Sequence, residues 1–467
     1  MKKRKMHNSE LPDCVKSYIF SKLSLKDLLK TMLPKSLPLF QDFQSQFATR
    51  LDQFILHHQG DMIHSIRVEF PLSDQHSHII DRMISKGISK GVKHIELLFS
   101  HDDVASDLTS ETKPYKFSFN LLSDTDSLIY LHLEKCLIEE STNLSGLKNL
   151  RTLVLHEVVV NQDMIQGLCC MKLLFHLNIV HYQRKRNIDI IASNLASIDY
   201  SYNHKYEPHT LKIEAHMLSK FSYKGGKISN RLVGYSGMRN MTTIVLDGVD
   251  ECLQYKVFPL LFSECLQLED VTFKNCRIMT FIHIDAMNLS SFEYVGHTTK
   301  RFFVKAPRLL KVFWNAAKRD KNPYPFGPIA RLHHIENVAM IINASQITEL
   351  SAILVRFQNL RQLELFIERA YDLNMDYFWI LYIAMASPHL QKFAVRIRHS
   401  DMKNSHMVGF KRQRREYAKF SHDDLKYVEL WAVRENGPRA LMVVGSNKII
   451  HEMLKDDVNE QCRLIIL

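Results

Sequence analysis

Residues 284–296 read IDAMNLSSFEYVG, and residues 213–225 read IEAHMLSKFSYKG, so the phrase I-x-A-x-x-L-x-x-F-x-Y-x-G occurs twice. Residues 304–314, VKAPRLLKVFW, give a third and less exact copy. Side chains alternate between the two faces of a β-strand, so the two aromatic residues that end each full copy point to the same side. One such strand cannot bury its apolar face alone. The repetition therefore predicts that neighbouring copies stack and cover one another.

The central part of the phrase, L-x-x-L-x-L, recurs along the chain. Start positions from Leu128 to Leu332 lie 20 to 27 residues apart, which is the unit length of leucine-rich repeats. Later steps of 28, 30 and 35 residues indicate insertions on the helical side. The thirteen matches are Leu128-Leu131-Leu133, Leu150-Leu153-Leu155, Leu174-Leu177-Ile179, Leu195-Ile198-Tyr200, Leu218-Phe221-Tyr223, Met241-Ile244-Leu246, Leu268-Val271-Phe273, Leu289-Phe292-Tyr294, Leu309-Val312-Trp314, Leu332-Ile335, Leu360-Leu363-Leu365, Leu390-Phe393-Val395 and Leu425-Val428-Leu430.

The segments between the matches differ from them in the periodicity of their apolar residues. Residues 159–176, VVNQDMIQGLCCMKLLFH, have helical rather than alternating periodicity. A repeated order of strand, turn and short helix predicts an α/β leucine-rich-repeat solenoid with a parallel sheet on its concave side. Cys136 and Cys276 follow the last core position of their repeats by three residues, where such repeats often place Asn or Cys. We expect both to be buried cysteines that serve the turn.

Composition is that of a globular protein: the 467 residues are 46% hydrophobic and 24% charged. No run of about 18 apolar residues is present, so no membrane span is expected. The basic start, MKKRKMHNSELPD, has no apolar segment behind it and does not resemble a secretory signal. The eight cysteines form no C-x-x-C pair, which favours free thiols and an intracellular location, nucleus or cytoplasm.

The formal net charge of +11 is spread over many turns, with clusters at Lys2–Lys5, Arg184–Arg186 and Lys411–Arg415. Lys2–Lys5, KKRK, fits a nuclear-import signal and a solvated tail equally well. No zinc-finger, helix-turn-helix or RNP pattern accompanies the charge, so nucleic acid is not an expected partner.

The N-terminal segment has a different pattern. In residues 9–33, SELPDCVKSYIFSKLSLKDLLKTML, apolar residues recur every three or four positions and predict two short helices. Asp13 and Ser24 are placed to cap them, and Pro34 ends the second. The two helices carry more apolar surface than they can bury, which predicts a partner.

These residues resemble the F-box of plant F-box/leucine-rich-repeat proteins. The matching positions are Leu11-Pro12-Asp13, Val15, Ile19-Phe20, Leu23 and residues 26–31, KDLLKT. The phrase quoted first and residues 47–72 and 79–99 also resemble that family, and residues 421–467 resemble its C-terminal domain in a degenerate, FBD-like form. Family F-boxes close with a stretch that holds Trp. This chain has no Trp before Trp314, which indicates a shortened third helix.

The resemblance implies four parts: an F-box at residues 9–45, a linker and solenoid cap at 46–91, repeats at 92–420 and an FBD-like cap at 421–467. It also implies a substrate receptor of an SCF-type ubiquitin ligase. The F-box would dock on a Skp-type adaptor bound to a cullin scaffold, and the repeats would bind a target protein. The adaptor-binding residues implied are Leu11, Pro12, Val15, Ile19 and Leu23. The alternative is a leucine-rich-repeat interaction scaffold whose decayed F-box no longer recruits a ligase.

The 24 histidines and the glycines form no catalytic or metal-binding pattern. His57-His58, His76 with His78, and His333-His334 match no H-E-x-x-H or Cys/His spacing. No G-x-S-x-G, Walker A or Rossmann glycine pattern is present. We therefore expect no enzyme activity, no cofactor and no metal.

Target recognition is expected on the side of the sheet opposite the core. The residues two, four and six positions after the leading residue of each L-x-x-L-x-L match point to that side. Aromatic residues carry much of the energy of protein interfaces. Phe313 and Phe366 are the expected anchors, because exposed apolar rings are costly without a use. The predicted target-binding residues are Tyr130, His132, His156, Lys311, Phe313 and Phe366.

Overall fold

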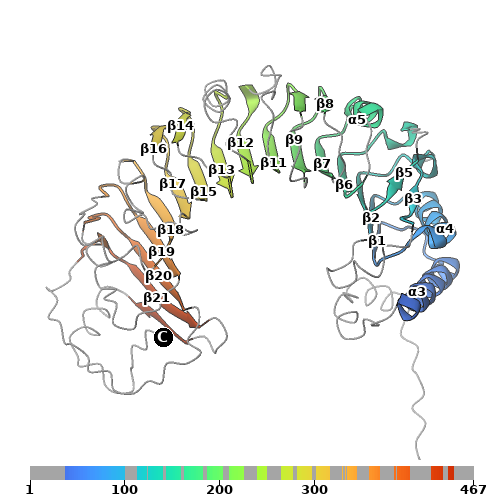
Figure 1. The fold of residues 1–467 in the computed structure, drawn as a ribbon, viewed down its shortest axis with the longest axis horizontal. Helices are drawn as coiled ribbons and strands as arrows, with labels where there is room; N and C mark the ends of the chain where they lie inside the picture. The colour runs from blue at the N-terminus through green and yellow to red at the C-terminus, as the bar shows by residue number, and fades with distance from the viewer. Residues whose placement is uncertain are drawn as a thin grey trace, which may run out of the picture. The chain divides into compact units, whose positions relative to one another are not determined.

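A computed structural model shows repeated strands joined by loops, short helices and further strands (Figure 1). It describes residues 37–99, 113–123, 125–139, 144–158, 162–181, 187–202, 210–225, 239–249, 265–276, 281–296, 301–315, 329, 332, 334–343, 357–368, 383–384, 386–399, 422–434 and 440–445. The chain divides into two compact units. The N-terminal unit is Met1–Arg184 with Asp189–Asn203, and the C-terminal unit is Lys185–Ile188 with His204–Leu467.

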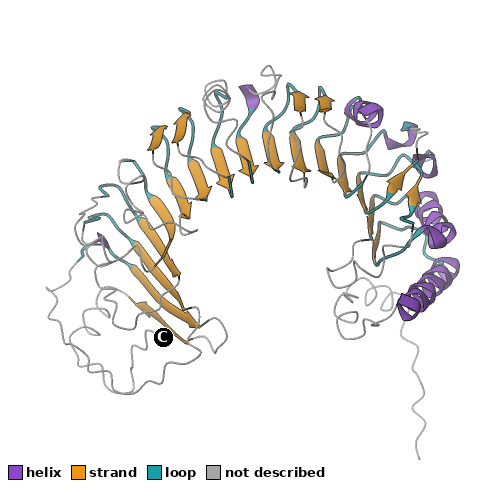
Figure 2. Cartoon of the chain, viewed as in Figure 1, coloured by secondary structure: helices purple, strands orange, loops and turns teal. Residues whose placement is uncertain are grey.

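In the N-terminal unit, strands follow one another in the order β1-β2-β4-β6-β7-β9, and each neighbouring pair is parallel. Helices α4 and α5 lie in connections between these strands (Figure 2). The bounds in this unit are α3 Leu37–His57, β1 Ser65–Glu69, η1 Asp74–His76, α4 Ser77–Ser89, β2 His94–Leu98, β3 Lys116–Phe117, η3 Phe119–Leu122, β4 Tyr130–Glu134, β5 Leu137–Ile138, η4 Ser145–Leu147, β6 Thr152–His156, α5 Gln162–Cys169, β7 His176–His181 and β9 Ser197–Tyr202. The division between the units falls within β8, Asn187–Ile191.

In the C-terminal unit the order is β11-β12-β13-β15-β17-β18-β19-β20-β21-β22. All neighbours are parallel except β22, which pairs antiparallel with β21. The bounds are β10 Thr210–Glu214, β11 Lys220–Lys224, β12 Thr243–Asp247, β13 Asp270–Lys274, β14 Phe281–Asp285, β15 Ser291–Val295, β16 Arg301–Lys305, β17 Lys311–Asn315, β18 Asn337–Asn343, β19 Gln362–Glu368, β20 Lys392–His399, β21 Tyr427–Arg434 and β22 Ala440–Gly445.

The predicted core positions are buried. Leu153, Phe221 and Tyr294 are each at most 1% exposed. The leading residues of their repeats, Leu150, Leu218 and Leu289, are also at most 1% exposed. Parallel pairing without a register shift sets each core residue beside its equivalent, as with Phe292 beside Val312. The side chains of Val428 and Leu430 lie outside the described ones. For the remaining matches the predicted register is confirmed, with one exception.

The exception is the match Leu332-Ile335, which is wrong by three residues. Val338 and Met340 lie opposite Val312 and Trp314, so Ile335, which is 2% exposed, is the leading residue, while Leu332 is only half-buried. Ile335 also stands 26 residues after Leu309 and 25 before Leu360, a more even spacing than Leu332 allows. The error arose because both Leu332 and Ile335 fit an apolar leading position.

The expectation of a helix between all strands is also incorrect. Residues 159–176 do contain helix α5, but the connections around β15 contain the parallel strands β14 and β16 instead (Figure 2). Ile282 and Ile284 alternate as buried residues on β14, and Ile284 pairs with Val304. The first two residues of the quoted phrase, Ile284 and Asp285, therefore end a strand of a second layer.

The turn after several sheet strands has a left-handed residue. Lys135, Glu157 and Asn275 have φ values of 53°, 55° and 51°, and Gly248 at the equivalent position has 74°. Each donates its backbone N–H to a carbonyl at or near the end of the neighbouring strand of the sheet, as Asn275 does to Val295 at 2.6 Å. The turn therefore supports the stacking of repeats as well as closing each strand.

The two turn cysteines are buried as predicted, each 1% exposed. The Cys136 thiol donates to the Glu134 carbonyl at 3.3 Å, and the Cys276 thiol lies 3.4 Å from the Lys274 carbonyl. Burial raises the pKa of the Cys276 thiol to about 12 and raises that of Cys136 as well. Both are therefore neutral thiols that satisfy backbone carbonyls.

Helix α3 covers the start of the N-terminal unit. Arg82 on α4 forms an ion pair of 2.6 Å with Asp52 on α3, and the rings of Phe47 and Phe70 stack at 4.1 Å. The helix continues through residue 45, where the sequence predicts an F-box to end. The predicted helices of residues 9–33 lie outside the described residues, and the four predicted parts stay predictions. In the described part of the chain, no helix combines the length and the apolarity needed to span a membrane.

Candidate protein-binding surface

The strands place every second side chain on the side of the sheet away from the core, which we call the open face. On β15 the buried pair Phe292 and Tyr294 alternates with the half-buried Ser291, Glu293 and Val295. Parallel, in-register pairing aligns these outer residues in rows, and Glu293 lies between Thr272 and Phe313. The open face is therefore an ordered array whose side-chain positions are set by the core.

Three predicted target-binding residues, Tyr130, His132 and His156, come together on the open face of the N-terminal unit. The ring of Tyr130 stacks on His94 with centroids 5.7 Å apart and meets His132 edge-on at 6.5 Å. Donor atoms of His132, Glu134 and His156 lie within 4.8 Å of one another. This patch combines aromatic rings with titratable groups.

The two histidines of this patch have opposite electrostatic environments. Burial lowers the pKa of His132. The hydrogen bond to Glu134 raises the pKa of His156, because its Nδ1 lies 3.2 Å from the Glu134 carboxylate, which is almost buried. His132 is therefore a neutral ring beside an imidazole that is paired with a carboxylate.

The other three predicted residues, Lys311, Phe313 and Phe366, lie on the open face of the C-terminal unit. Lys311 is exposed, and Phe313 is half-buried between Glu293 and Ala339. Phe366 is also half-buried, since the Arg396 guanidinium lies 5.1 Å from its ring centroid. Neither ring is fully exposed. The argument that an exposed apolar ring is costly without a binding role therefore applies only to the outer surface of each ring.

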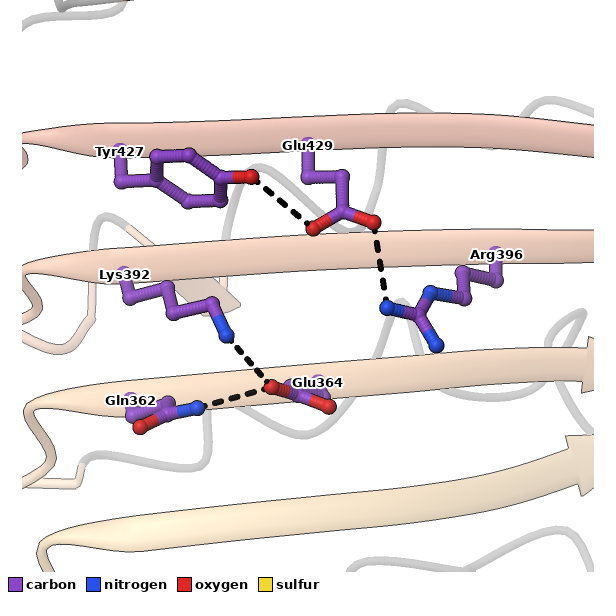
Figure 3. A network of polar contacts seen from close by, with 6 residues as sticks. All are labelled: Gln362, Glu364, Lys392, Arg396, Tyr427 and Glu429. Carbon is purple, nitrogen blue, oxygen red and sulfur yellow. Dashed lines mark hydrogen bonds and ion pairs between the residues drawn. The ribbon is translucent and has the colours of Figure 1, made fainter. Parts of the chain in front are cut away.

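A polar network continues this surface over β19, β20 and β21 (Figure 3). Glu364 accepts hydrogen bonds of 2.8 Å from Lys392 and from Gln362. Burial alone would raise the pKa of Glu364, but these hydrogen bonds outweigh it and hold the pKa below its ordinary value.

The second carboxylate of the network belongs to Glu429, which is 6% exposed. It accepts from Arg396 at 3.1 Å and from the Tyr427 hydroxyl at 3.2 Å. Arg396 thus joins Glu429 to the ring of Phe366. The arrangement presents two cations and two aromatic rings in fixed positions on one face.

Sequence reasoning selected Phe366 but missed Lys392, Arg396, Tyr427 and Glu429. Their signal was present, because they are alternating positions around the confirmed core pair of β20 and the predicted core pair of β21. The predicted adaptor-binding residues have no structural outcome, since they lie outside the described residues: Leu11, Pro12, Val15, Ile19 and Leu23.

The rows of parallel strands and their buried repeat positions define the chain as a leucine-rich-repeat solenoid protein. The family model described as At1g61320/AtMIF1, LRR domain, matches residues 55–173 and 250–435, more than half of the chain. The chain therefore belongs to the At1g61320/AtMIF1 leucine-rich-repeat family, which is named for a plant leucine-rich-repeat protein. A domain of this kind is suited to serve as a protein-interaction scaffold.

No curated protein matches the chain. Among solved structures, "Crystal structure of TLR13-ssRNA13 complex" shows 12% sequence identity and a TM-score of 0.34, over 72% of this chain and 56% of that one.

Proposed function

We propose that this protein is a target-recognition subunit that binds a protein on the open face of its repeats. The observation that carries the proposal is the patch formed by Phe366, Arg396 and the Glu364 and Glu429 networks. Aromatic and arginine side chains are enriched at the energetic centres of interfaces. Their mutual contacts limit the side-chain freedom that binding would otherwise remove.

The finer proposal is that the segment before the repeats links this recognition to an SCF-type ubiquitin ligase. It rests on the resemblance of residues 9–45 to an F-box, with Leu11, Pro12, Val15, Ile19 and Leu23 as the surface for a Skp-type adaptor. A cullin scaffold would then join through the adaptor. In this proposal the chain works inside the cell and has no enzyme activity of its own.

Affinity capture with variant chains tests the open face. Changing Phe313 and Phe366 together to Ser should remove a captured target, because both anchors lose their rings. The matched control changes Leu266 and Met287 to Ser. These apolar residues are 68% and 57% exposed and lie in turns rather than on sheet strands. Loss of target with the first pair and retention with the second supports the proposal. Retention with both places recognition outside the open face.

A pull-down with purified Skp-type adaptor tests the ligase proposal separately. The full chain should retain the adaptor, and Leu11→Ala combined with Pro12→Ala should release it while the melting temperature stays unchanged. If the parent and this double variant recover equal amounts of adaptor, the chain is instead an interaction scaffold that recruits no ligase.

A further inference from the structure

We propose that His132, Glu134 and His156 form a zinc-binding site on the open face of the N-terminal unit. One donor atom from each residue lies within 4.8 Å of the other two. Two histidines and one glutamate are a known ligand set for zinc, with three protein ligands and an open fourth position. The inference does not depend on the proposed target or ligase.

The strand geometry explains why these three residues meet. His132 and Glu134 are two positions apart on β4 and therefore share the open face. His156, on the neighbouring strand β6, lies directly opposite Glu134. The sequence separates His132 from His156 by a whole repeat, so no short spacing motif could reveal the group.

One distance in the cluster already suits a shared ion. The Nδ1 atom of His156 is 3.2 Å from Oε1 of Glu134. Two ligands at about 2.0–2.1 Å on a tetrahedral zinc stand about 3.3 Å apart. The donor atom of His132 lies within 4.8 Å of the other two, so it would move toward them by up to about 1.5 Å when all three bind one ion.

A simple ion pair would explain His156 and Glu134 but not His132. Its Nε2 atom is buried and has no hydrogen-bond partner among the described residues. A buried polar atom without a partner costs free energy. A metal ion bound by this Nε2 atom would supply the missing partner.

Two further carboxylates and two positive groups surround the cluster. Glu96 lies opposite His132 on β2, and a Glu157 carboxylate oxygen is 3.7 Å from Nε2 of His156. Two positive groups oppose them, since Arg67 forms an ion pair of 3.4 Å with Glu96 and Lys135 one of 3.6 Å with Glu157. These pairs leave the Glu134 carboxylate to neutralise the ion. The imidazole ligands favour zinc over calcium and magnesium.

Zinc content of the full-length protein tests the site. The chain is freed of metal with a chelator, equilibrated with Zn²⁺ beside a competing chromophoric chelator, and its bound zinc is counted. His132→Phe keeps an aromatic ring against Tyr130 and removes the ligand, so we expect one equivalent of zinc fewer than in the parent. Glu134→Gln, which keeps the side-chain shape, should lose the same equivalent.

The control is His176→Phe, the same change on the open face of β7, where His176 faces Asp199 at 3.5 Å. It should hold as much zinc as the parent. Thermal melts give a second readout, because zinc should raise the melting temperature of the parent and of His176→Phe but not of His132→Phe. If His132→Phe and Glu134→Gln bind as much zinc as the parent, or if the parent binds none, the proposal is overturned.

Discussion

The side-chain amide of Asn240 donates a hydrogen bond of 2.8 Å to the carbonyl oxygen of His216, one repeat earlier in the chain. Asn288 makes the same contact with Leu266 at 2.8 Å, and Asn149 makes it with Asp126 at 2.5 Å. Each asparagine stands immediately before the leading residue of its repeat. This position therefore links successive repeats through the backbone ahead of the sheet strands.

Other side chains at the same position also contact one another. Arg308, before Leu309, donates to the amide oxygen of Asn288 at 2.8 Å. His389, before Leu390, lies 3.1 Å from Asp424, before Leu425. The template L-x-x-L-x-L omits this position, although it contributes polar links in parallel with the apolar core.

Removing one asparagine link should weaken the fold measurably. We expect Asn240→Ala to lower the free energy of unfolding by about 1 kcal/mol, the net value of a typical hydrogen bond. Asn240→Asp should cost at least as much, because a carboxylate of the same size cannot donate and repels the His216 carbonyl. Denaturant unfolding measures both variants. Equal stability of Asn240→Asp and the parent would show that this link contributes nothing.

The core register predicts opposite outcomes at adjacent residues of β6. Leu153 is fully buried, so Leu153→Asp should cost at least about 3 kcal/mol through lost packing and an unpaired buried charge. Val154 points to the open face, and Val154→Asp should cost less than about 1 kcal/mol. Thermal melts of the two variants compare them directly. A Leu153→Asp variant as stable as Val154→Asp is incompatible with the strand orientation.

The corrected register before β18 can be tested in the same way. Ile335→Ala should cost about 2–4 kcal/mol, because Ile335 is 2% exposed and truncation leaves a cavity. Leu332→Ala removes a half-buried side chain and should cost clearly less. Unfolding in denaturant gives both values. The reverse order would restore Leu332 as the leading residue of its repeat.

The network on the open face predicts a pH dependence of stability. The pKa of Glu364 lies below its ordinary value of 4.5 in the folded protein. Its ionised form therefore stabilises the fold above the unfolded-state pKa, and this contribution is lost as pH falls through the folded-state pKa. The stability difference between the parent and Glu364→Gln should thus shrink from about pH 7 to about pH 3.

Lys392→Met provides the matched test, because it removes a hydrogen bond that lowers the pKa of Glu364. In the Lys392→Met background, Glu364→Gln should change the pH dependence of the free energy of unfolding less than it does in the parent. Chemical unfolding across the pH range measures this double-mutant cycle. A stability difference that stays constant with pH would contradict the assigned role of Glu364.

The sequence by itself determined the class of fold and most of its core. Alternation puts the apolar side chains of a strand on one face. A repeat of 20–27 residues then places an equivalent strand beside the first, with its apolar side chains on the same face of the sheet. Leu153, Phe221, Tyr294 and Trp314 followed from this rule alone. The rule worked because burial of apolar area is local to each strand and its neighbours.

Only the tertiary structure decided what depends on distance between repeats. It showed that Ile335 rather than Leu332 leads its repeat, since pairing with Val312 and Trp314 selects the register among several apolar residues. It also brought His132 to His156 and Arg396 to Phe366. These pairs lie a full repeat apart in the chain and side by side on adjacent strands, because hydrogen bonding between strands brings them together in space.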